Sequence, residues 1–275
     1  MGQSQMLPRA EQAGVDGGSR NAPPSRSGFD PSTFTDSESG FGDPRALDRG
    51  PHAWLRESLQ LDLSHPKVRI TAQKLTQALQ SIPARVAAIQ AFVRRLPFAT
   101  SLDSRRILAS EVLRRGHGDC HSKGVLFVAL CRAADIPARL LFVDVRTDFL
   151  CGILDEGPRV LPHAVGQAWV DGCWISTDGY VVDPALFAQA KLRLRNENRD
   201  CGWGIVLEAT GLWRGDCDCL QQFRPADVVR SHGVFHDARE FYARSATSGT
   251  AGRRGLKYAV GAHLVNRRVG RARRP

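Results

Sequence analysis

The chain has 275 residues, of which 42% are hydrophobic, and its formal net charge is +10. That hydrophobic fraction suffices for a real core in one large domain or two small ones. No segment approaches the roughly 18 consecutive apolar residues of a membrane span, and the N-terminal region lacks the apolar core of a secretory signal. These features exclude a membrane-spanning protein, and we expect a cytoplasmic one.

The first fifty residues differ in composition from the rest. Gly, Ser, Pro and Asp dominate them, as in the run GGSRNAPPS at residues 17–25. Such a segment cannot bury enough apolar surface to offset its ordering entropy. We predict a disordered lead over residues 1–50, a folded domain over 51–245 and a basic, flexible tail over 246–275.

Helical periodicity begins after Pro51. The apolar spacing predicts one helix that ends before Pro83, a second that ends near Pro97 and a short third element at residues 110–113. A further helix is expected over residues 120–134, because its apolar residues recur at helical spacing, and a strand over residues 140–145 follows it.

The dipeptide Asp171-Gly172 is a strong hairpin signal between two strand-like runs. A two-residue loop there pairs Trp169 with Trp174 and makes His163 a diagonal cross-strand neighbour of Asp178, with β-carbons about 7 Å apart. A helix is expected next, over residues 185–194. Helices first and an antiparallel sheet later indicate an α+β fold.

Cys120 opens the helix that follows Gly118 and Asp119. Gly118 permits a tight approach to the helix, and Asp119 is a suitable N-cap. The unpaired N–H groups and the dipole of a helix N-terminus favour a thiolate at this position. Cys120, His163 and Asp178 thus supply a thiol nucleophile, a base and a carboxylate that can orient the base.

These residues carry a resemblance to a known family. The turn Gly118-x-Cys120, the run IPAR at residues 136–139, and His163, Trp174 and Asp178 on a hairpin resemble the transglutaminase-like superfamily. Separately, residues 61–69 and the region at 233–235 resemble bacterial members that are stand-alone domains. The resemblance implies a papain-like fold, in which N-terminal helices and the nucleophile at a helix N-terminus pack on an antiparallel sheet. It also implies that Cys120 is the nucleophile, His163 its base and Asp178 the residue that orients His163.

The resemblance implies acyl transfer through a thioester, and we expect hydrolysis of an amide or peptide bond by a protease, amidase or deamidase. Two alternatives stay open, namely an amine-accepting transglutaminase and a catalytically inactive relative that serves as a binding module. The departures Val165 and Gln167 bear on activity, since many relatives carry an aromatic and an acidic residue there.

Neither a cofactor nor a metal is expected. Cys217 and Cys219, with Cys201 nearby, form the only cysteine cluster, but their spacing departs from that of zinc ligands. The tail suggests a rival role in weak binding of a polyanion such as nucleic acid, because it is basic and contains no acidic residue. Its basic residues are Arg253, Arg254, Lys257, Arg267, Arg268, Arg271, Arg273 and Arg274.

Overall fold

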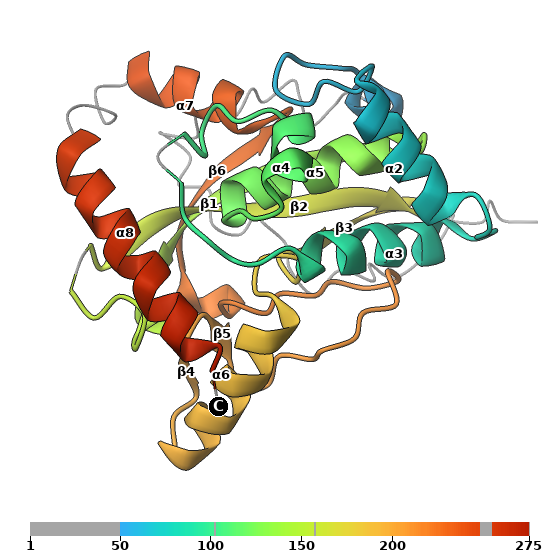
Figure 1. Cartoon of the computed structure of the whole chain (residues 1–275). Coiled ribbons are helices and arrows are strands. Elements are labelled where there is room, and N and C mark those ends of the chain that lie inside the picture. The colour runs from blue at the N-terminus through green and yellow to red at the C-terminus, as the bar shows by residue number, and fades with distance from the viewer. Residues whose placement is uncertain (1–49, 102, 157, 248–254, 275) are drawn as a thin grey trace, which may run out of the picture.

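An antiparallel four-stranded sheet with the strand order β3-β2-β1-β6 is the centre of the computed structural model (Figure 1). The α+β fold class is confirmed. The predicted N-terminal lead at residues 1–49 lies outside the described part of the chain. The strands are β1 (Ala138–Arg146), β2 (Val160–Val170), β3 (Cys173–Thr177) and β6 (Val228–Phe235). The structure describes residues 50–101, 103–156, 158–247 and 255–274.

Helices α2 to α5 gather on one face of this sheet, and α5 lies directly against β1 and β2 (Figure 1). The helix α6 contacts α8 near the C-terminal end of the chain. A minor two-stranded sheet pairs β4 (Cys201–Gly202) with β5 (Ile205–Val206). The α-helices are α2 (Pro66–Thr76), α3 (Ile82–Arg95), α4 (Ala109–Arg115), α5 (Cys120–Ala133), α6 (Pro184–Asn196), α7 (Ala238–Thr247) and α8 (Gly255–Ala272), and the short 3-10 helices are η2 (Pro51–Leu55), η3 (Asp148–Leu150) and η4 (Pro225–Asp227).

The first predicted helix boundary is wrong. The helix α2 already ends at Thr76, and Pro83 does not stop a helix but lies in the first turn of α3. Proline is tolerated there because the first N–H groups of a helix have no intrahelical partner. The side chain of Ser81 caps the new helix by accepting a hydrogen bond from the N–H of Ala84.

The predicted hairpin is confirmed, with Trp169 opposite Trp174 and Val170 opposite Cys173. Asp171 and Gly172 adopt φ values of 48° and 90°, as a tight two-residue turn requires. The strand β3 ends at Thr177, so Asp178 is the first residue beyond the paired segment.

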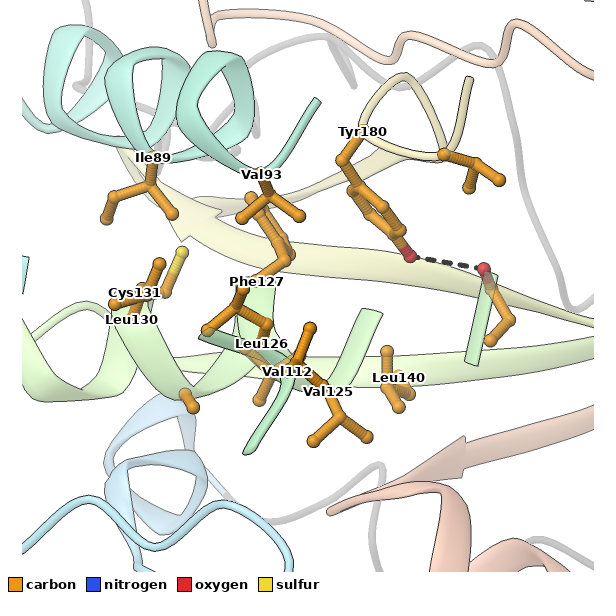
Figure 2. Packing of buried hydrophobic residues seen from close by; sticks show 14 of the residues in the cluster. Ile89, Val93, Val112, Val125, Leu126, Phe127, Leu130, Cys131, Leu140 and Tyr180 are labelled. Atoms are coloured by element: carbon orange, nitrogen blue, oxygen red, sulfur yellow. Dashed lines mark hydrogen bonds between the residues drawn. The ribbon is translucent and has the colours of Figure 1, made fainter. Parts of the chain in front are cut away.

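The helix α5 is enclosed by protein from His121 to Arg132. Figure 2 shows Ile89 and Val93 of α3 facing Phe127 and Cys131 of α5. The Phe127 ring stacks on Tyr180 with 5.2 Å between centroids. Burying each large apolar side chain stabilises the fold by about 1.5–3 kcal/mol, so the position of α5 is firmly determined.

The basic C-terminal segment is not a flexible tail over its described part, contrary to the prediction. It forms α8, whose Val269 and Ala272 are buried. Arg273 donates hydrogen bonds to the Asp183 carboxylate and to the carbonyl of Phe98. The prediction failed because the many arginines masked an amphipathic helix with a small apolar face.

Arg273→Ala tests the anchoring of α8. Burial raises the pKa of Asp183, but hydrogen bonds from Arg273 and from the backbone N–H groups of Phe98 and Leu186 outweigh burial and hold this pKa below its usual value. A depressed carboxyl pKa contributes stability above the unfolded value of about 4, and that stability is lost as the pH falls. We expect a loss of about 1–3 kcal/mol in the free energy of unfolding at pH 7, shrinking below about pH 4.

Urea denaturation between pH 3 and 7 measures this difference. Arg271→Ala is the matched control, because Arg271 is exposed on the same helix. Equal losses in both variants would contradict the anchoring role of Arg273.

Candidate active site

Cys120 is the first residue of α5, as predicted, and Asp119 is its N-cap. The Asp119 carboxylate accepts the N–H of Ser122 at 3.0 Å, and the Ser122 hydroxyl accepts the N–H of Asp119 at 2.8 Å. This reciprocal capping box fixes the first turn of the helix. Gly118 precedes it in a short parallel bridge to Phe98. The capping box and this bridge therefore fix the backbone that carries Cys120.

His163 and Asp178 lie together, as the hairpin register predicts. The distance from His163 Nε2 to Asp178 Oδ2 is 3.5 Å, and both side chains are almost completely buried. This separation is longer than a normal hydrogen bond. His163 Nε2 faces the carboxylate, which leaves Nδ1 as the ring nitrogen available to a thiol.

The Asp178 carboxylate is anchored by main-chain donors. Its Oδ1 accepts the N–H of Gln221 at 2.6 Å, and its Oδ2 accepts the N–H of Gln222 at 3.2 Å. The N–H of Asp178 in turn donates to the carbonyl of Cys219. Because a buried charge is costly without such partners, this segment sets the direction of the carboxylate toward His163.

The backbone of β2 contacts the thiol directly. The N–H of Ala164, the residue that follows His163, acts on the Cys120 sulfur in the sense that lowers the pKa of the thiol. The carbonyl of Ala164 accepts the Tyr180 hydroxyl at 3.1 Å. Ala164, the residue next to the predicted base, therefore interacts with the core through its carbonyl and with the thiol through its N–H.

Burial raises the pKa of Cys120, and the negative charges of Asp119 and Asp178 raise it further. The N–H groups of Ala164 and His121 act in the opposite direction. The expectation that the helix N-terminus alone would favour the thiolate is therefore incomplete. In this enclosed setting, the thiol needs donors or a nearby imidazole to give up its proton.

His121, the second residue of α5, lies beside the thiol. Its side chain is buried, and its Nδ1 lies 3.4 Å from Cys120 Sγ. Its Nε2 lies 2.9 Å from the hydroxyl of Tyr242 on α7. No local pattern indicates this contact, since Tyr242 follows Cys120 by more than a hundred residues.

Gln167, which departs from the family pattern, belongs to a polar network on the hairpin. It accepts a hydrogen bond from Arg139 Nε at 2.7 Å and donates one to Ser176 at 3.1 Å. The Arg139 guanidinium lies 3.8 Å from the ring centre of Trp174. An amide therefore partners Arg139 where many relatives have an acidic residue, and the hairpin keeps its polar cross-link.

Within the described ranges, no group of three or more His, Cys, Asp or Glu side chains is arranged to hold a metal ion. No helix in that part of the chain combines the length and apolar character needed to cross a bilayer. Two of the basic residues proposed to meet a polyanion are already paired, Arg268 with Asp155 and Arg273 with Asp183.

Part of the chain matches the model of a known family. Residues 69–179 match the model of the transglutaminase-like superfamily, and this segment includes Cys120, His163 and Asp178. The chain contains a transglutaminase-like domain. The curated proteins contain no match to the chain.

Two solved structures are similar to the transglutaminase-like chain. A "putative cysteine protease" from Cytophaga hutchinsonii has a TM-score of 0.45 and 17% identity, covering 74% of this chain and 53% of that one. A "putative protease" from Parabacteroides distasonis has a TM-score of 0.32 and 18% identity, covering 46% of this chain and 24% of that one. This chain thus spans about half the length of the first protein and about a quarter of the second.

Gly118→Ala tests the turn that presents Cys120. An added β-carbon would collide with Ser122 Oγ of the capping box and would lie 3.0 Å from Lys123 Cγ. We expect a loss of about 1–2 kcal/mol in the free energy of unfolding, because the box must shift or break. Urea denaturation measures it.

Gly270→Ala is the matched control, since nothing lies within 4 Å of its added β-carbon. On helix α8 this change should be neutral or stabilising by up to about 1 kcal/mol. A Gly118→Ala protein as stable as wild type would contradict the proposed collision.

Proposed function

We propose that this protein is a thiol acyl-transfer enzyme that hydrolyses an amide or peptide bond, with Cys120 as nucleophile, His163 as base and Asp178 as orienting carboxylate. The observation that carries the proposal is the buried pair of His163 Nε2 and Asp178 Oδ2 at 3.5 Å, next to Ala164, whose N–H lowers the pKa of the Cys120 thiol. The membership of residues 69–179 in the transglutaminase-like superfamily supports it.

In the first half-reaction, Cys120 Sγ attacks the carbonyl carbon while His163 Nδ1 takes the thiol proton. The negative charge on the carbonyl oxygen develops near the N-terminus of α5, where the N–H of Cys120 is a suitable donor, worth about 3 kcal/mol in comparable sites. The carbon–nitrogen bond then breaks, and the leaving amine takes the proton from His163. A thioester with Cys120 remains.

Water completes the reaction. His163 accepts a proton from the water molecule as its oxygen attacks the thioester carbon, and the carbon–sulfur bond breaks. The carboxylic acid leaves, and the proton returns to the sulfur. Throughout, Asp178 keeps the His163 tautomer with the proton on Nε2, because its carboxylate is the acceptor at that nitrogen.

Cys120→Ala should abolish turnover without unfolding the protein. We expect a loss of at least about a thousandfold in the rate on a panel of peptide aminocoumarin amides, because no thioester can form. His163→Ala should lower the rate to a similar extent. Fluorescence of the released coumarin measures turnover, and circular dichroism checks the fold.

Cys173→Ala is the control for the loss of a thiol, because Cys173 is half-buried on the hairpin away from the proposed triad. If Cys120→Ala kept the wild-type rate, Cys120 would not be the nucleophile. Incorporation of dansylcadaverine into casein faster than hydrolysis would instead favour the amine-accepting alternative. Absence of both activities in a folded wild type would favour the inactive binding module.

A further inference from the structure

A second histidine contacts the proposed nucleophile. His121 Nδ1 lies 3.4 Å from Cys120 Sγ, and the side chain of His121 is 8% exposed. Since His163 is assigned to take the thiol proton, His121 has no role in the mechanism derived above. A buried imidazole in contact with the reacting atom nevertheless affects the free energy of the thiolate.

The edge of the His121 ring that carries Nε2 contacts Tyr242 of α7. The Tyr242 hydroxyl lies 2.9 Å from His121 Nε2, and the two rings lie 5.5 Å apart. The Arg105 guanidinium lies 4.1 Å from the ring centre of Tyr242, and Phe142 packs against both rings. Tyr242 is thus a supported side chain rather than a chance surface contact, and it lies outside the segment 69–179 that matches the family model.

Several charged and titratable groups surround the two histidines and the thiol. Burial lowers the pKa of His121 to about 4, the Asp119 charge opposes this shift, and His163 and Arg105 add to it. His121 is therefore neutral near pH 7. A neutral imidazole carries one N–H, and a hydroxyl donating to Nε2 places that N–H on Nδ1, which faces the sulfur.

We propose that His121 is a further catalytic residue, which donates its Nδ1–H to the Cys120 thiolate, and that Tyr242 is the positioning residue that fixes this tautomer through Nε2. The inference rests on the proposed function and deepens it. His163 removes the proton, while His121 and the N–H of Ala164 stabilise the sulfur anion that remains. These two donors offset the free energy that burial adds to the Cys120 thiolate, which the negative charges of Asp119 and Asp178 also disfavour.

The test is the pH dependence of iodoacetamide alkylation at Cys120, mapped by mass spectrometry on the full chain. Tyr242→Phe keeps the ring and removes the hydroxyl. We expect its alkylation inflection to rise by about one pH unit and its rate at pH 7.5 to fall roughly tenfold, because a donor to the thiolate is weakened. His121→Phe should shift the inflection at least as far, and His121→Asn, whose amide N–H can replace Nδ1–H, should recover part of the shift.

Arg239→Ala is the control on α7, because Arg239 is exposed, and its inflection should equal that of wild type. An unchanged or lower inflection in folded Tyr242→Phe would overturn the proposal, as would equal shifts in His121→Asn and His121→Phe. Failure of the proposed function is separately visible. In that case Cys120→Ala would keep wild-type turnover and His163→Ala would leave alkylation unaltered, whatever the His121 and Tyr242 variants do.

Discussion

The buried carboxylate of Asp178 is the constraint on which the site depends. Its side chain is removed from water, so its charge requires compensation from within the protein. The main-chain N–H groups of Gln221 and Gln222 donate hydrogen bonds to the carboxylate, and the His163 ring lies 3.5 Å away. Removing one of these partners would leave the buried carboxylate with fewer compensating groups. The carboxylate therefore holds three parts of the chain together, namely the segment around Gln221, the end of β3 and His163 on β2.

A second buried ionisable side chain lies about one helical turn after Cys120 on α5. Lys123 is completely buried, and its ammonium donates to the carbonyls of Leu96 at 2.7 Å and Val181 at 2.8 Å. Burial lowers its pKa well below the usual value. Through these two hydrogen bonds, Lys123 links the end of α3 to the chain just after Asp178. The helix α5 therefore positions both Cys120, at its first residue, and the turn that follows Asp178. A single helix thereby sets both ends of the proposed triad relative to each other.

Local signals in the sequence predicted a large part of this arrangement. The Asp171-Gly172 turn determined the hairpin register and so brought His163 to Asp178, and the sequence around Asp119 predicted the start of α5. The sequence could not predict the contact of His121 with Tyr242, because it joins residues far apart in the chain. It also misled at the C-terminus, where contacts between residues far apart in the chain, such as the pairing of Arg273 with Asp183, distinguish a docked helix from a basic tail.

The electrostatics of the thiol bring these features together. Burial and two carboxylates disfavour a charge on Cys120, whereas a nucleophile must reach its anionic form. An opposing contribution comes from oriented N–H groups, at Ala164 on β2 and at the start of α5. Such dipoles are already fixed when the charge develops, so little reorganisation is needed at the moment of attack. The rigidity of the surroundings would then lower the barrier to attack by the proposed nucleophile, and α7 contributes to that rigidity through the contact of Tyr242 with His121.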